Sequence, residues 1–163
     1  MQQVIRRDAP FGTVHHLIGC RWQPRKAAEF KGALAMSKTR PQELGSLVVL
    51  IVEDEFFLRC NLADCLRDAG WVVMEAATAD DAMAMCQAGM AVHVLITDIQ
   101  LNASASGWDV AEAFHASSSD TAVIYTSAHS GDRTRSVPNS LHFTKPYQPT
   151  DVLKACRQLV ASQ

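Results

Sequence analysis

The chain has 163 residues, of which 48% are hydrophobic, and a formal net charge of -2; these totals indicate a globular protein with one domain of ordinary size plus an appendage. The charge is divided unevenly, since residues 1–46 carry eight basic and three acidic side chains, whereas residues 47–163 carry seven basic and fourteen acidic ones. No stretch reaches the roughly 18 consecutive apolar residues that a membrane-spanning helix needs, and the acidic balance of the longer part argues against direct binding to DNA.

Residues 1–46 show no sustained periodicity and are interrupted by several Pro and Gly residues. We predict a basic, largely flexible N-terminal extension, with one short helix over residues 24–36 as an alternative for that stretch. Met36 lies just before the regular part of the chain and offers an alternative start of translation. The extension lacks the apolar core of a secretion signal, and an acidic partner or an anionic surface would suit its charge.

From Leu47 onward the pattern becomes regular and predicts a single domain over residues 47–163. Short apolar runs at residues 47–52, 71–75, 92–97, 122–126 and 141–144 predict five strands. Apolar residues at helical spacing predict helices over residues 57–69, 78–87 and 108–116, and a last helix that Pro149 and Thr150 cap. Strands that alternate with helices predict an α/β fold: a flavodoxin-like, doubly wound, five-stranded parallel sheet of order 2-1-3-4-5.

One interval is too short for a full crossover with its helix. Residues 128–140, between the fourth and fifth predicted strands, include Gly131 and Pro138. A crossover that contains a helix needs at least about 10–12 residues. We therefore predict a shortened fourth helix of one or two turns at most, or none.

Acidic side chains follow two strands that would be neighbours in this sheet. Glu53 and Asp54 come directly after the first strand, and Asp98 ends the third. In open α/β sheets, ligands bind beyond the carboxyl ends of the strands. Converging carboxylates repel one another unless they take up protons or bind a cation, and Mg²⁺ is the cation that hard oxygen ligands with room for water suit. The alternative is that these residues form a solvated turn and that Asp98 caps the next one.

Two more groups belong to the same edge. Ser127 ends the fourth strand and offers a hydroxyl, and Lys145 ends the fifth strand just before Pro146. A carboxylate nucleophile, Mg²⁺, a hydroxyl and a fixed ammonium together indicate a phosphoryl-transfer site.

At this point the sequence resembles the receiver domain of bacterial two-component response regulators, in its stand-alone, single-domain form. The resemblance covers residues 47–161 and is carried by V-L-I-V-E-D-E (49–55), L-I-T-D-I-Q-L (95–101), V-I-Y-T-S-A-H (123–129) and T-K-P-Y (144–147). It implies that Asp98 is the phosphoacceptor and that Glu53 and Asp54 serve Mg²⁺. The backbone carbonyl of Gln100 would be a further ligand of the ion.

The resemblance also assigns the remaining positions of the site. Ser127 would be the switch hydroxyl, Ala128 the small residue beside the phosphoryl group, and Lys145 its cationic partner. The Lys145–Pro146 bond would be the cis peptide of the family, a form that is plausible only before proline.

Two positions depart from the family's pattern. His142 occupies the position that is usually Tyr or Phe, which adds a pH sensitivity to the switch. Asn102 stands where the family often has Pro, and we expect this difference to matter little. The shortened fourth helix also puts dimerisation through the usual output face in doubt.

The implied function is a phosphorylation-dependent signalling switch, not an enzyme. A histidine kinase or a histidine phosphotransfer protein would donate the phosphoryl group, and a downstream protein would receive the signal. Five cysteines without a C-x-x-C spacing suit a reducing cytoplasm. One alternative function is a Mg²⁺-dependent phosphohydrolase of the haloacid dehalogenase type, but that chemistry requires a second Asp at the position of Gln100. The other alternative is a receiver-like interaction module that works without phosphorylation. The intact set of site residues argues against it.

Overall fold

The computed structural model describes residues 47–102, 105–129 and 133–162. The expected basic extension, residues 1–46, and its alternative short helix lie outside the described residues. None of the helices in the described part of the chain has the length and apolarity that crossing a membrane requires. The elements are β1 (Val48–Val52), α1 (Phe56–Asp68), β2 (Val72–Ala76), α2 (Ala79–Gln87), β3 (Val94–Asp98), α3 (Gly107–Ser117), β4 (Ala122–Ser127), β5 (Leu141–Thr144) and α4 (Pro149–Ala161).

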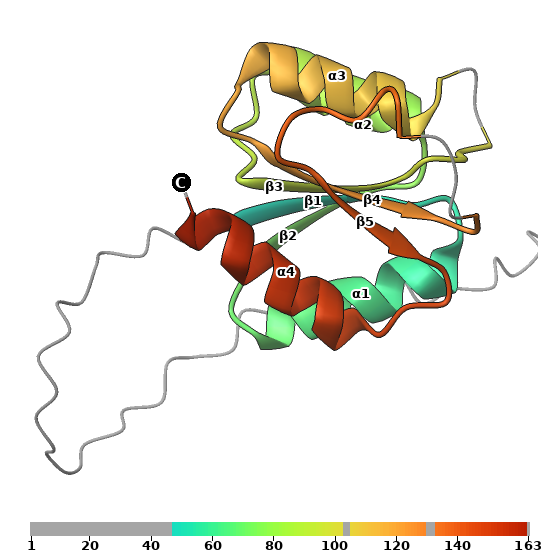
Figure 1. The fold of residues 1–163 in the computed structure, drawn as a ribbon, viewed down its shortest axis with the longest axis vertical. Coiled ribbons are helices and arrows are strands. Elements are labelled where there is room, and N and C mark those ends of the chain that lie inside the picture. The colour runs from blue at the N-terminus through green and yellow to red at the C-terminus, as the bar shows by residue number, and fades with distance from the viewer. Residues whose placement is uncertain (1–46, 103–104, 130–132, 163) are drawn as a thin grey trace, which may run out of the picture. The chain divides into compact units, whose positions relative to one another are not determined.

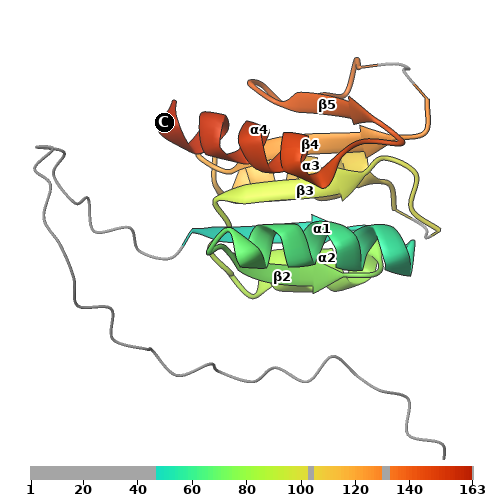
Figure 2. The ribbon, with the colours of Figure 1, turned by 90° about the horizontal axis from the view of Figure 1, so that it is seen from below.

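The five strands form one parallel sheet in the order β2-β1-β3-β4-β5, which confirms the predicted topology. Helices α2 and α3 cover one face of the sheet, and α1 and α4 cover the other (Figures 1 and 2). Strands β3 and β4 lie inside this sandwich and are buried along their whole length. The edge strands β2 and β5 are only partly buried, as expected of strands with one open side.

The sheet separates two hydrophobic cores, because successive side chains of a strand point to opposite faces. In β1, for example, Leu50 belongs to the core under α2 and α3, whereas Ile51 belongs to the core under α1 and α4. Continuous apolar runs in the sequence are therefore needed to supply both faces at once. The core under α1 and α4 contains Ile51, Leu62, Leu66, Ile96, Ile124 and Val152, and the other contains Leu50, Leu95, Val110, Phe114, Val123 and Tyr125.

Two details of the helices differ from the sequence-based expectations. Phe57 was expected in the apolar stripe of α1, but its side chain is 79% exposed, since the residues that face the sheet are Leu62, Ala63 and Leu66. The last helix is not capped by Pro149 and Thr150: Gln148 is its N-cap, and Pro149 is its first residue. Proline is well suited to that position because it has no N–H that would need a partner.

The crossover from β4 to β5 contains no helix in its described residues, 128–129 and 133–140. The predicted shortening of the fourth helix is thus confirmed for this part of the chain. Other contacts hold the segment against the sheet and α3: Val137 is buried and donates its N–H to the Tyr125 hydroxyl at 3.3 Å. The guanidinium of Arg135 lies 2.7 Å from Asp109 and 2.9 Å from Glu112, both on α3.

Candidate functional site

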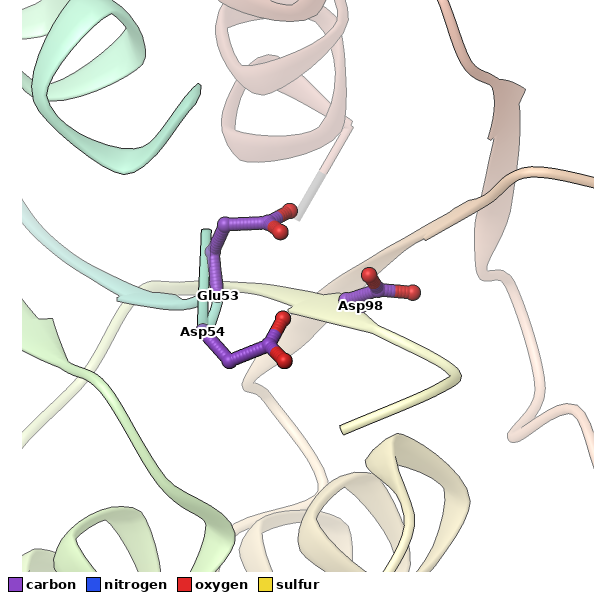
Figure 3. Close-up of side chains that lie close together, drawn as sticks. All are labelled: Glu53, Asp54 and Asp98. Carbon is purple, nitrogen blue, oxygen red and sulfur yellow. The ribbon is translucent and has the colours of Figure 1, made fainter. Parts of the chain in front are cut away.

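Three carboxylates meet where β1 and β3 end. The two strands are parallel neighbours with Val52 opposite Thr97, so the residues that follow, Glu53 and Asp98, emerge side by side. Ligand oxygens of Glu53, Asp54 and Asp98 all lie within 4.8 Å of one another (Figure 3). Glu53 is 2% exposed and Asp98 is 6% exposed, whereas Asp54 is half-buried. The set consists only of hard oxygen donors, which fits Mg²⁺.

Lys145 reaches this cluster from the end of β5. Its Nζ lies 2.5 Å from Asp98 Oδ2 and 2.7 Å from Glu53 Oε2. The Lys145 backbone N–H donates to the Ser127 carbonyl at 2.8 Å, so Lys145 lies beside the end of β4. The following Lys145–Pro146 peptide bond is cis.

Burial and the ammonium act in opposite directions on the ionisation of the cluster. Burial raises the pKa of the Glu53 carboxyl, against the lowering effect of Lys145. Burial by itself would lower the pKa of Lys145, but its hydrogen bonds to Asp98 and Glu53 outweigh that effect and raise it. The lysine is therefore held in its charged form. One ammonium facing three carboxylates leaves a surplus of negative charge, which favours a divalent cation.

The backbone after Asp98 is folded tightly against the acid. The Gln100 N–H donates to Asp98 Oδ1 at 2.9 Å, and the Gly107 N–H donates to the Ile99 carbonyl at 3.1 Å. A Cβ atom on Gly107 would lie only 1.9 Å from the Asp98 carbonyl oxygen. Only glycine allows helix α3 to begin this close to the strand. Sequence reasoning gave Gly107 no role, although a single glycine between a small-residue loop and a helix was a signal.

Two other residues that sequence reasoning did not assign to the site support the acidic pair. The Arg59 guanidinium donates to the Glu53 carbonyl at 2.5 Å and also pairs with Glu75 of β2 at 3.4 Å. The Asn102 side-chain amide donates to the Asp54 carboxylate. Asn102, which stands where the family often has Pro, thus contacts a predicted metal ligand, and the expectation that this difference matters little stays a prediction. No local pattern could reveal the contact, since it joins two loops that are far apart in the sequence.

Ser127 and Ala128 stand at the same edge, at the end of β4. Ser127 is 8% exposed, and its hydroxyl accepts a hydrogen bond from the His129 N–H at 3.2 Å. Thr126 is opposite Asp98 in the register of β3 and β4, so Ser127 follows directly beside the acid. Ala128 comes next and is exposed.

His142 lies apart from the carboxylates, in an aromatic group between β4, β5 and α3. Its ring stacks on Tyr125 with 4.8 Å between centroids and lies 5.9 Å from the ring of Trp108. Its Nε2 is 2.9 Å from the Ser136 hydroxyl in the β4–β5 crossover. Burial, together with the charge of Arg133, lowers the pKa of His142. The residue therefore connects β5 to the β4–β5 crossover.

Comparisons with known proteins agree with this geometry. A family model described as the response regulator receiver domain matches residues 49–157. A response regulator receiver protein from Sinorhizobium medicae WSM419 aligns with a TM-score of 0.70 and 26% identity, covering 73% of this chain and 98% of its own. The chemotaxis response regulator CheY4 of Vibrio cholerae aligns with a TM-score of 0.61 and 23% identity, covering 70% and 98%.

A CheY-like response regulator receiver domain protein from Methanospirillum hungatei JF-1 aligns with a TM-score of 0.64 and 20% identity, covering 72% of this chain and 95% of its own. At identities this low, the CheY4 and Methanospirillum structures support the fold alone. No curated protein gives a significant match.

Proposed function

The chain belongs to the response regulator receiver family, and from this premise we propose that it is a phosphorylation-dependent signalling switch with Asp98 as its phosphoacceptor. Receiver domains are regulatory phosphoacceptor domains and not classical enzymes. The observation that carries the assignment is the position of Asp98: its carboxylate lies in an acidic cluster and contacts the Lys145 ammonium at 2.5 Å. A nucleophile, cation ligands and a fixed positive charge thus meet at one edge of the sheet.

The proposed metal site consists of Glu53, Asp54 and Asp98, with the backbone carbonyl of Gln100 as a fourth protein ligand. These are oxygen donors only, as Mg²⁺ prefers. When bound, Mg²⁺ would neutralise negative charge on the phosphoryl group and on the attacking carboxylate. The surplus negative charge around Lys145 supports a divalent ion in this place.

In the proposed reaction, a carboxylate oxygen of Asp98 attacks the phosphorus of a phosphohistidine. The new O–P bond forms as the N–P bond breaks, and the imidazole of the donor leaves with the bonding electron pair and takes up a proton. The Lys145 ammonium stabilises the charge on the transferred group, and the Ser127 hydroxyl donates a hydrogen bond to it. Ala128 leaves room for the phosphoryl oxygens beside Ser127.

The proposed response to phosphorylation runs from Ser127 to His142. If the Ser127 hydroxyl moves toward the phosphoryl group, the end of β4 shifts, and His142 can follow because it stacks on Tyr125 of the same strand. The His142 side chain is hydrogen-bonded to Ser136, so a shift of His142 would also change the surface of the crossover. This is a two-state response to a local change in charge.

The partners in this proposal are proteins. A histidine kinase or a histidine phosphotransfer protein supplies the phosphoryl group, and a downstream protein reads the altered surface. The proposal assigns this role to residues 47–163 and treats residues 1–46 as a basic extension outside the receiver domain. It places the protein in the cytoplasm, which is supported by the free thiols of Cys65, Cys86 and Cys156.

The test is phosphorylation of the full chain by acetyl phosphate or by a phosphohistidine donor in the presence of Mg²⁺. We expect an acid-stable but base-labile label on the wild type, none on Asp98→Ala, and none on the wild type after EDTA treatment. Asp68→Ala, which removes an exposed carboxylate at the end of α1, is the matched control and should be labelled like the wild type. Equal labelling of Asp98→Ala would refute the assignment, and sustained turnover of phosphate monoesters would indicate a phosphohydrolase instead.

A further inference from the structure

The three carboxylates of the cluster are held by different groups. Glu53 and Asp98 share the Lys145 ammonium, and Asp98 also accepts the Gln100 N–H at 2.9 Å. The Asp54 carboxylate accepts a hydrogen bond from the side-chain amide of Asn102. Asn102 belongs to the loop after Asp98, whereas Asp54 belongs to the loop after β1.

The chemical nature of this partner matters. A neutral amide orients a carboxylate through a hydrogen bond and leaves its negative charge intact. A second lysine would orient it as well, but would cancel the charge that a cation needs. Asp54 is half-buried, so without a partner its carboxylate would sample several rotamers and would lose that freedom when it bound an ion.

We propose that Asn102 is a positioning residue of the metal site, which holds the Asp54 carboxylate in the orientation that it needs to share a divalent cation with Glu53 and Asp98. The inference rests on the proposed function, because it presupposes that the cluster binds Mg²⁺. It adds a residue that lies outside the family's acidic pair, at a position where the departure from the family's Pro is expected to matter little. The contact also fastens the loop that carries Gln100 to the loop that carries the acidic pair.

The test measures binding of Mg²⁺ to the full chain by isothermal titration calorimetry, with Mn²⁺ and electron paramagnetic resonance as an independent readout. Asn102→Ala loses one hydrogen bond to a charged group in a partly exposed place. We expect this loss to raise the dissociation constant for Mg²⁺ roughly 3- to 10-fold. Asn61→Ala, at an exposed position of α1, is the matched control and should bind like the wild type. Without metal, the melting temperature of Asn102→Ala should differ little from that of the wild type, because Asn102 is exposed and the hydrogen bond joins two surface loops.

A double-mutant cycle with Asp54→Ala separates positioning from direct ligation. If Asn102 acts through Asp54, Asn102→Ala weakens binding in the wild-type background and has no further effect in the Asp54→Ala background. An equal loss in both backgrounds would mean that Asn102 contacts the ion itself and would overturn the proposal. Wild-type affinity in Asn102→Ala would overturn it while leaving the metal site intact, whereas no binding of Mg²⁺ by the wild type would overturn the metal site and this inference together.

Discussion

Replacement of Gly107 by Ala tests how tightly the start of α3 is packed against the end of β3, at Asp98. The added Cβ would lie 1.9 Å from the Asp98 carbonyl oxygen and 2.8 Å from the Asp98 carbonyl carbon, where contacts under 3.0 Å essentially never occur. The Thr97 hydroxyl oxygen, also 2.8 Å away, belongs to a side chain, but the two carbonyl atoms belong to the backbone, so turning a side chain cannot relieve the clash. The helix must therefore move off the strand by at least about 1 Å, a separation that also strains the hydrogen bond from the Gly107 N–H to the Ile99 carbonyl.

The magnitude follows from the two losses and one gain. Overpacking of this kind costs about 1–3 kcal/mol, and the weakened backbone hydrogen bond adds about 0.5–1.5 kcal/mol. Alanine in a helix in place of glycine returns at most about 1 kcal/mol. With the full gain counted, we expect Gly107→Ala to lower the free energy of unfolding by about 0.5–3.5 kcal/mol. Because the displaced carbonyl belongs to Asp98, phosphorylation of the variant should also be slower.

The assay is equilibrium unfolding in urea, followed by circular dichroism, together with the rate of labelling by acetyl phosphate. Ala116→Gly, at an exposed position of the same helix, serves as the control for helix propensity, and it should lose about 1 kcal/mol while being labelled at the wild-type rate. A Gly107→Ala protein as stable as the wild type, or more stable, would refute the reasoning, since helix propensity alone predicts that outcome.

Three further predictions concern the charged and aromatic groups around the site. Lys145→Ala should lower the free energy of unfolding by about 2–4 kcal/mol at neutral pH, because it leaves buried carboxylates without their cation. Millimolar Mg²⁺ should restore part of this loss in urea unfolding experiments, and a variant that Mg²⁺ does not stabilise would contradict the proposed charge balance of the cluster. The pKa of His142 is lowered below its ordinary value of 6.5, so as the pH falls below that value the unfolded chain binds a proton more readily than the folded chain, and the free energy of unfolding falls. Unfolding measured at two pH values should show a smaller drop in this free energy for His142→Phe than for the wild type. An equal drop in both proteins would exclude His142 as the source of the pH dependence. Arg135→Ala should speed amide hydrogen exchange in residues 133–137, because its ion pairs with α3 at 2.7 and 2.9 Å are lost, whereas Arg133→Ala should not. Equal exchange in both variants would mean that the ion pairs of Arg135 do not hold the crossover.

The fold and the acidic cluster could be predicted because they depend on patterns that are local in the sequence. A parallel strand buried on both faces needs a continuous apolar run, and β1, β3 and β4 each show one. A parallel sheet brings the carboxyl ends of its strands to one edge, so Glu53, Asp54, Asp98 and Lys145 meet there once the strand order is known.

The expectation for Phe57 failed because helical spacing identifies a stripe but not where it ends. In the first turn of α1, the aromatic residues Phe56 and Phe57 are exposed. The contact between Asn102 and Asp54 could not be predicted for a different reason, since it joins two loops whose paths are set by the rest of the fold. Loop conformations depend on many weak contacts, and pairings between loops leave no periodic signal in the sequence.

By itself the sequence determined the order of strands and helices, the burial of the central strands and the kinds of groups at the edge of the sheet, because periodicity and residue chemistry are properties of short segments. Only the tertiary structure decided how those groups contact one another: Lys145 bridges Glu53 and Asp98, Asn102 is hydrogen-bonded to Asp54, and Gly107 lets α3 begin against the Asp98 carbonyl. It also decided that the β4–β5 crossover is held by Arg135 and by the contact between Ser136 and His142. The physical reason is that hydrogen bonds and close contacts depend on the relative positions of distant segments to within about an ångström, and those positions are settled only when the whole core packs.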